Sequence, residues 1–170
     1  MRRKWMSVAL LSAVLVGTAL YIRNAAATPA SGFVGTTLAL GRFGEIDTFN
    51  QLVEHGGPPW LSMQRTKGLS DLYVQNNVWQ PGGSTGWHSH PGHSLIIVTA
   101  GTVTDYESDA PGCTPAIYTK GMGFVDPGGD HVHNIRNETG VLATTVTVQL
   151  IPADAVRRVD APQPENCPAF

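Results

Sequence analysis

The chain has 170 residues, a formal net charge of −2 and only 14% charged residues. This length suggests a single domain. No segment gathers basic residues into a stripe, so nucleic acid is not expected as a partner. Nineteen glycines and twelve prolines indicate many turns. Together with plentiful Val, Thr and Ile, they favour short strands over long helices.

Residues 1–27 differ from the rest of the chain. Basic residues at positions 2–4 precede a mostly apolar run over 6–22, and three alanines follow at 25–27. This layout is typical of a secretory signal peptide and predicts a secreted or extracytoplasmic protein. An uncleaved N-terminal anchor, with the domain facing outside, is the alternative because the run approaches the length of a membrane span. Contact with a membrane is expected only if this N-terminal segment stays uncleaved.

The remaining residues divide into an N-terminal extension with the first strand or strands (28–71), a core (72–151) and a C-terminal tail (152–170). In the extension we expect a strand at 37–40, and a helical turn or loop over 47–54. Further strands are expected at 72–79, 95–99, 102–106, 115–119, 121–125 and 142–151.

Two of these predicted strands carry clear patterns. The segment 95–99 is an apolar run, which is typical of a strand buried on both faces or of a short interior run. In the segment 142–151, Thr145, Thr147 and Gln149 alternate with apolar residues, which indicates a strand with two different faces. Many short strands at close spacing predict a sandwich or a barrel.

Five of the six histidines lie in two short segments, 82–94 and 127–137. Imidazole is the commonest protein ligand for transition metals. His88 and His90 are two residues apart, so on an extended strand both side chains point to the same side. His133 lies in the second segment, where His131 shares its parity. Three imidazoles on barrel strands can bind one metal and leave other coordination positions open.

The two segments resemble the paired motifs of the cupin superfamily. The first motif, Gly-x5-His-x-His-x3-Glu-x6-Gly, is matched by Gly82, His88, His90 and Gly101, with Ser94 in place of the glutamate. The second motif, Gly-x5-Pro-x-Gly-x2-His-x3-Asn, is matched by Gly121, Pro127, Gly129, His133 and Asn137, with one extra residue before the histidine.

The resemblance covers about residues 72–151. It implies an all-β, single-domain double-stranded β-helix, that is, a cupin-like jelly-roll barrel. Such barrels often pair through their sheets, so a homodimer is an open possibility.

The resemblance also implies a site in which His88, His90 and His133 bind a divalent transition metal: Fe, Zn, Mn or Cu. The fourth position is open. A hydroxyl is a poor metal ligand, so we expect Ser94 to orient a water molecule or to pack against its neighbours. His93, which lies beside it in the sequence, is the other candidate for the fourth ligand. His131 competes with His133 for the histidine position of the second motif, and His133 is preferred because it precedes Asn137 at the motif's spacing. His131 is then expected to support the metal ligands or to contact a substrate.

No general base can be placed from the sequence, and His131 and His93 are candidates by proximity alone. Asp126 and Asp130 are interpreted as solvated or capping residues of a turn.

Cys113 and Cys167 are the only cysteines. In an exported protein a disulfide is the simplest use of such a pair. Free thiols, or a cysteine that ligates the metal, are the alternatives. The sequence favours the disulfide because neither cysteine lies close to a histidine.

Three functions are compatible with these features. The first is an exported metalloenzyme acting on a small organic substrate, either as a dioxygenase or as an isomerase or lyase. The second is a non-catalytic module that binds a small ligand or a metal. The third is a structural domain with a stabilising metal, for which three ligands are too few.

Overall fold

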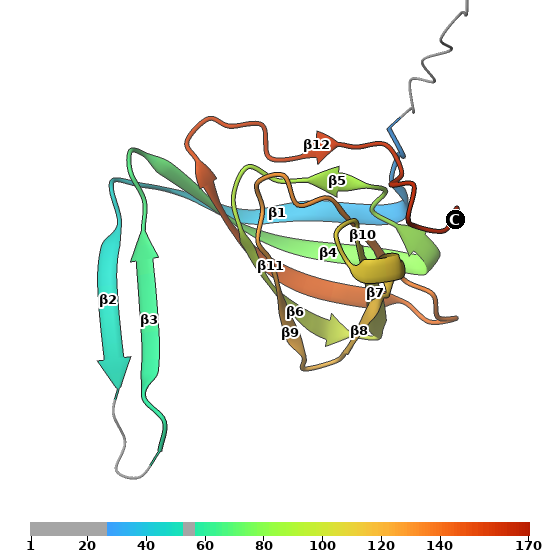
Figure 1. Ribbon diagram of the computed structural model, residues 1–170, viewed down its shortest axis with the longest axis horizontal. Coiled ribbons are helices and arrows are strands. Elements are labelled where there is room, and N and C mark those ends of the chain that lie inside the picture. The colour runs from blue at the N-terminus through green and yellow to red at the C-terminus, as the bar shows by residue number, and fades with distance from the viewer. Residues whose placement is uncertain (1–26, 53–56) are drawn as a thin grey trace, which may run out of the picture.

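The computed structural model describes residues 27–52 and 57–170 of the chain (Figure 1). The segment predicted as a signal peptide or anchor lies outside these residues, apart from Ala27. The described strands are β1 (Ser31–Phe43), β2 (Asp47–Leu52), β3 (Trp60–Arg65), β4 (Ser70–Ser84), β5 (His88–Ser89), β6 (Ser94–Ala100), β7 (Thr102–Glu107), β8 (Ala116–Thr119), β9 (Gly123–Asp126), β10 (His133–Arg136), β11 (Ala143–Pro152) and β12 (Val159–Asp160), with a 3₁₀ turn at Pro111–Cys113. Within these ranges no helix is long and apolar enough to cross a bilayer.

Ten strands form one antiparallel sheet that curls into a nearly closed barrel (Figure 1). The long strand β4 lies at its centre, paired with β1 on one side and with β11 on the other. From β11 the sheet continues through β6 to β9. Strand β10 contacts β4, β5 and β7 and closes the barrel from the other direction. The all-β barrel predicted from the two histidine motifs is therefore confirmed.

Strands β2 and β3 form a separate hairpin that extends away from the barrel (Figure 1). The prediction of a helical turn or loop over 47–54 is wrong for the described part, because residues 47–52 pair along β3. The cross-strand pair Phe49 and Met63 shares one face with Leu61, and all three side chains are more than half exposed. The local sequence of β2 shows no clean alternation, so pairing with the later strand determines its conformation.

The sheet has a polar inner face along β11. Thr145, Thr147 and Gln149 are buried and line an internal cavity. Strand β6 alternates as well: Ile96 is 4% exposed, whereas Leu95 and Ile97 are 52% and 54% exposed. The prediction that 95–99 is buried on both faces is therefore wrong. Apolar side chains occupy both faces of β6, but only one face is covered.

The main apolar core fills the part of the barrel interior beside the cavity. It consists of Trp79, Ile96, Val98, Val103, Phe124, Ile135 and Ala143. Trp79, Ile96 and Ile135 also line the cavity, so the core forms one of its walls. Full burial of a large apolar side chain stabilises a fold by roughly 1.5–3 kcal/mol. The residues that support this wall are thus also among those that hold the barrel together.

Cys113 and Cys167 form a disulfide, as the sequence predicts. The bond packs with Trp87 and Tyr106 in a second apolar cluster. It ties the C-terminal tail to the turn after β7. Disulfides are typical of proteins from oxidising compartments outside the cytoplasm.

A charged pair fastens β1 to β4. Arg42 donates from Nε and Nη2 to the two carboxylate oxygens of Asp71, at 2.8 and 2.9 Å. The Asp71 carboxylate also accepts a hydrogen bond from the backbone N–H of Asp154. The guanidinium of Arg42, with help from this N–H, lowers the pKa of Asp71 to about 2.

We expect the double substitution Cys113→Ser and Cys167→Ser to lower the free energy of unfolding by about 2–4 kcal/mol. The disulfide joins residues 54 positions apart, and without it the unfolded chain gains conformational freedom. Urea denaturation of the variant and of the oxidised wild type measures the difference. An unchanged midpoint at an unchanged slope would contradict the expectation.

The pair of Arg42 and Asp71 predicts a defined pH dependence of stability. Because the folded-state pKa of Asp71 lies below its ordinary value of 3.8, the stabilisation is fully present above that value and is lost as the pH falls toward about 2. We expect Arg42→Gln to be less stable than wild type near neutral pH, with the difference vanishing in strong acid.

Denaturant titrations across this pH range measure the effect. The matched control is Arg65→Gln, which removes a pair with Asp47 whose side chains are both mostly exposed. Exposed pairs contribute little, so this control should differ little from wild type at any pH. A difference between wild type and Arg42→Gln that is independent of pH would contradict the assignment to Asp71.

Candidate metal centre

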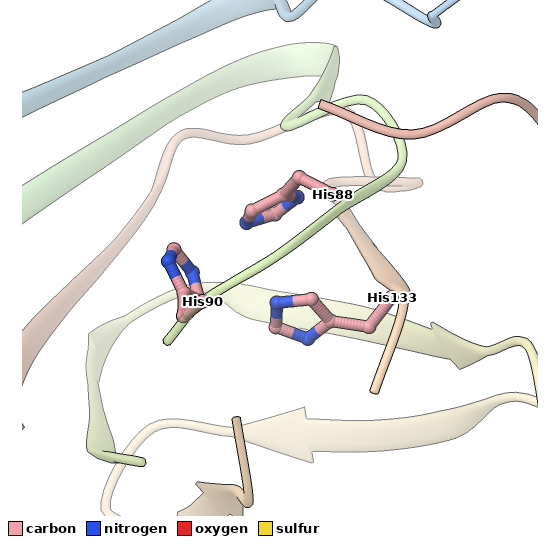
Figure 2. A group of neighbouring side chains, drawn as sticks. All are labelled: His88, His90 and His133. Atoms are coloured by element: carbon pink, nitrogen blue, oxygen red, sulfur yellow. The ribbon is translucent and has the colours of Figure 1, made fainter. Parts of the chain in front are cut away.

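Three histidines from two paired segments meet inside the barrel (Figure 2). His88 begins β5, His90 follows that strand, and His133 begins β10. His133 lies directly opposite His88 in the antiparallel register. The ring centroid of His88 lies 4.5 Å from that of His133 and 4.8 Å from that of His90. One nitrogen from each ring lies within 4.8 Å of the other two, so the three rings can bind a single metal ion.

Backbone carbonyls determine which nitrogen of His88 and His90 carries the proton. Nδ1 of His88 lies 2.8 Å from the carbonyl oxygen of Gly86, and Nδ1 of His90 lies 2.5 Å from that of Arg157. A carbonyl oxygen only accepts, so Nδ1 carries the hydrogen in both rings. Nε2 of each ring therefore retains its lone pair, which is the form that ligates a metal.

A carboxylate lies beside His133. Its Nδ1 lies 3.5 Å from Oδ1 of Asp105, and both side chains are 2% exposed. Among the described residues, neither Nδ1 nor Nε2 of His133 has a hydrogen-bond partner, although both are buried. Asp105 lies beside Nδ1, which leaves Nε2 for a metal. An unsatisfied polar atom costs free energy in the interior. A bound cation would satisfy this nitrogen, so the residues present fit a metal ion.

The protonation of the three rings is set by burial and by neighbouring charges. Burial, with the positive charges of His133 and Arg158, lowers the pKa of His88. Burial also lowers the pKa of His90, against the opposing effect of its bond to the Arg157 carbonyl. Burial opposes protonation of His133 too, but the carboxylates of Asp105, Asp126 and Glu107 together outweigh it and raise the pKa of that ring. His88 and His90 are thus neutral near pH 7 and ready to ligate.

Asp126 is a site residue that the sequence analysis missed. The sequence predicts a solvated or capping turn residue at this position, but the side chain is 1% exposed and lines the cavity. It does cap the turn, since one carboxylate oxygen accepts from the backbone N–H of Gly128. The other oxygen lies 3.9 Å from Nε2 of His90. The signal was its parity, because Asp126 shares a face of β9 with the core residue Phe124.

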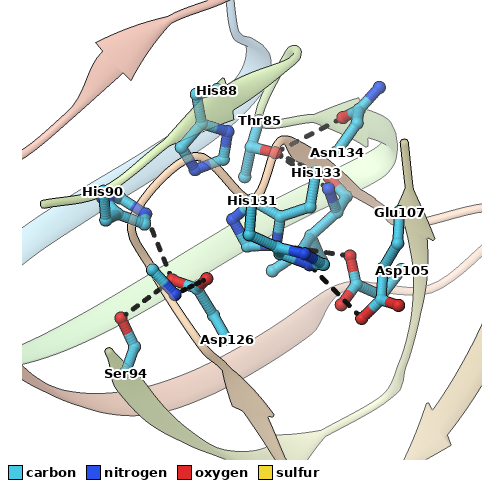
Figure 3. A network of polar contacts seen from close by, with 12 residues as sticks. Thr85, His88, His90, Ser94, Asp105, Glu107, Asp126, His131, His133 and Asn134 are labelled. Carbon is cyan, nitrogen blue, oxygen red and sulfur yellow. Dashed lines mark hydrogen bonds and ion pairs between the residues drawn. The ribbon is translucent and has the colours of Figure 1, made fainter. Parts of the chain in front are cut away.

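Ser94 occupies the position of the motif glutamate and faces Asp126 across the β6–β9 pair. Its hydroxyl donates to the Asp126 carboxylate at 3.2 Å (Figure 3). It also accepts from the side-chain amide of Gln149 at 3.4 Å. The serine therefore positions a carboxylate of the neighbouring strand.

The structure does not bring His93 or His131 into the cavity. His93 lines a separate hollow beside Thr66 and Leu150. The ring centroid of His131 lies 6.0 Å from that of His133. Its Nε2 lies 3.5 Å from Glu107 (Figure 3) and its Nδ1 3.4 Å from Asp109. Neither residue is among those that line the cavity with the three clustered imidazoles.

The three imidazoles open onto a cavity of about 260 Å³. Its polar wall includes Asn77, which donates to the hydroxyls of Thr145 and Thr147. Two arginines of the C-terminal segment, Arg157 and Arg158, complete the lining. The sequence predicts only a C-terminal tail over 152–170, and no local pattern marks its arginines as cavity residues.

Neither a protein-family model nor a curated protein matches this sequence. Solved structures that are similar to it include a cupin domain from Bordetella pertussis, at 21% identity and a TM-score of 0.40 over 63% of this chain and 93% of that one. Another is an oxalate oxidase, at 19% identity and a TM-score of 0.41 over 48% and 46%.

A third similar structure is Peruvianin-I, a cysteine peptidase from Thevetia peruviana latex. It is 26% identical with a TM-score of 0.40, over 46% of this chain and 49% of that one. The chain spans about half the length of this peptidase and of the oxalate oxidase. Both cysteines of the present chain are joined in the disulfide.

We expect Asp105→Asn to weaken metal binding by about 10–100-fold, because loss of a carboxylate that orients a ligand histidine has effects of this size. Competition with a chromogenic chelator for Zn²⁺ measures the affinity. The matched control is Glu107→Gln, which removes a carboxylate that contacts His131 instead of the ligand ring. Equal affinity in Asp105→Asn and wild type would show that Asp105 does not orient His133.

Proposed function

We propose that this chain is an exported cupin-type metalloprotein that acts on a small organic molecule through a metal bound by His88, His90 and His133. The observation that carries the proposal is the buried Nε2 of His133, which lacks a protein partner among the described residues and lies beside two imidazoles with free Nε2 atoms. Export is supported by the disulfide and by the signal-like pattern of residues 1–27.

The donor set is compatible with Fe, Zn, Mn or Cu. Imidazole-rich sites bind Cu and Zn most tightly, and these ions withstand an oxidising compartment better than Fe(II). Three protein ligands leave positions open for a substrate. When bound, the ion supplies Lewis-acid polarisation of a carbonyl or redox chemistry with O₂, which corresponds to an isomerase or lyase, or to a dioxygenase.

Asp126 is the residue we assign to proton transfer. Among the residues that the structure describes it is the one carboxylate in the cavity lining, and its Oδ2 lies 3.9 Å from Nε2 of His90. The Ser94 hydroxyl donates to the same oxygen and fixes its position. A carboxylate placed in this way can accept a proton from a substrate in the cavity. It takes the place of His131 and His93, which lie outside the cavity.

The second candidate is a non-catalytic module that binds a small ligand. It is favoured by the polar wall, because Asn77, Thr145, Thr147 and Gln149 offer hydrogen bonds without acid–base chemistry. A binding module requires only that such groups fix the orientation of the ligand. The two candidates share the metal and differ in the need for Asp126.

Elemental analysis of the purified chain tests the metal site. We expect about one equivalent of a transition metal in the wild type, and less than about a tenth of that in the double variant His88→Ala/His90→Ala, which removes two of three ligands. The control is His93→Ala, which removes an imidazole outside the cavity and should retain the metal. Unchanged metal content in the double variant would refute the site.

Assays of the metal-loaded protein separate the two candidates. For an enzyme we expect O₂ consumption or isomerisation with members of a panel of catechols, thiols and diketones, and loss of turnover in Asp126→Asn. For a binding module we expect thermal stabilisation by a ligand without turnover, retained in that variant. Turnover that persists in Asp126→Asn would contradict the role of Asp126.

A further inference from the structure

Arg157 is held at the cavity wall by residues of three strands. Its Nε donates to Oε1 of Gln149 on β11 at 3.1 Å, and its Nη1 to Oγ1 of Thr37 on β1 at 3.4 Å. Its guanidinium carbon lies 4.4 Å from the ring centroid of Tyr73 on β4. A guanidinium fixed in this way loses little entropy when it binds a further partner.

This arginine has no acidic partner among the described residues. Its neighbour in sequence, Arg158, pairs with Asp160, and the arginines that form ion pairs elsewhere in the described chain are Arg42, Arg65 and Arg136. A guanidinium has five N–H donors, of which Arg157 uses two within the described protein. Burial lowers the pKa of Arg157, so the charged form is held at a cost that an anion in the cavity would offset.

Positive charge in the cavity lining is left uncompensated at Arg157. Of the two arginines that line the cavity, Arg158 pairs with Asp160. The lining carboxylate of Asp126 is bound by Ser94 and by the Gly128 N–H, and among the described residues it forms no ion pair with Arg157. A divalent cation between the imidazoles would add further positive charge. Positive charge in an enclosed site raises the local concentration of anions.

We propose that Arg157 binds the anionic group of the cavity's ligand and that this ligand is a small carboxylate. The planar fork of a guanidinium matches the two oxygens of a carboxylate, and the adjacent Gln149 adds a fixed amide. Phosphate sites typically use the N-terminus of a helix, and the described residues form no α-helix. The inference deepens the proposed function by naming the substrate class, but it does not require the metal.

Ligand-observed NMR titrations with lactate and lactamide test the inference, since the two probes differ only in the charged group. Both the chelator-treated chain and the Zn²⁺-loaded chain are titrated. In wild type we expect lactate to bind at least about tenfold more tightly than lactamide, because the free energy of one charge-assisted hydrogen bond changes the Kd by about this factor. In Arg157→Gln we expect this preference to disappear.

The matched control is Arg65→Gln, which removes one positive charge on the hairpin and should keep the wild-type preference. Should Arg157→Gln fail to fold, Arg157→Lys retains the charge but loses the fork, and we expect a several-fold loss of lactate affinity. Three results would overturn the inference: equal binding of lactate and lactamide by wild type, an unchanged preference in the Arg157 variants, or inorganic phosphate binding more tightly than lactate.

Metal content separates this inference from the proposed function. Arg157 contacts His90 through its backbone carbonyl, so Arg157→Gln should retain the metal of the wild type. A wild type without metal that still prefers lactate through Arg157 would refute the metalloprotein and support the carboxylate site. A metal-loaded wild type that does not distinguish lactate from lactamide would refute the carboxylate site alone.

Discussion

The short antiparallel pairing of β5 with β10 is the constraint on which the site depends. It places His88 directly opposite His133, although the two residues are far apart in sequence. Because side chains alternate between the faces of a strand, a slip of one residue would turn one of these imidazoles out of the cavity. On its other edge β5 pairs with β12, the strand that follows Arg157. The same short strand therefore unites the ligands and the C-terminal arginines.

The barrel reverses the usual relation between hydrophobicity and burial along part of its wall. Thr145, Thr147 and Gln149 are buried, whereas Leu95 and Ile97 on the neighbouring β6 are more than half exposed. The inner polar groups avoid the cost of unsatisfied burial because they bond to one another. Asn77 donates to the two threonines. Gln149 donates to Ser94, which in turn donates to Asp126 (Figure 3). A polar cavity inside an all-β fold is stable only when its wall is satisfied in this way.

The sequence predicts features that are determined locally, and it does not predict those that depend on distant strands or on which face of a strand is covered. The spacing of His88 and His90 determines locally that both side chains point the same way, and the second motif identifies His133. The three imidazoles that the fold brings together could therefore be predicted. The run at 95–99 was misjudged because hydrophobicity alone does not tell which face of a strand is covered. Asp126 and Arg157 were missed for a different reason: their environment comes from strands distant in sequence. The hairpin β2–β3 likewise depends on pairing that residues 47–52 do not reveal by themselves.

The arrangement of charge in the cavity predicts how the proposed ligand would be oriented, whatever the reaction. Asp105 and Asp126 lie on the side of the imidazoles, at His133 and His90, where they favour a cation. Arg157 is fastened to Gln149 and Thr37 and favours an anion. A small molecule with a carboxylate and a neutral polar group would therefore direct the carboxylate to Arg157 and the other group toward the imidazoles. Asp126 is the one carboxylate that the described residues contribute to the lining. The neutral end of such a molecule would therefore lie close both to the imidazole nitrogens and to a carboxylate that can accept a proton.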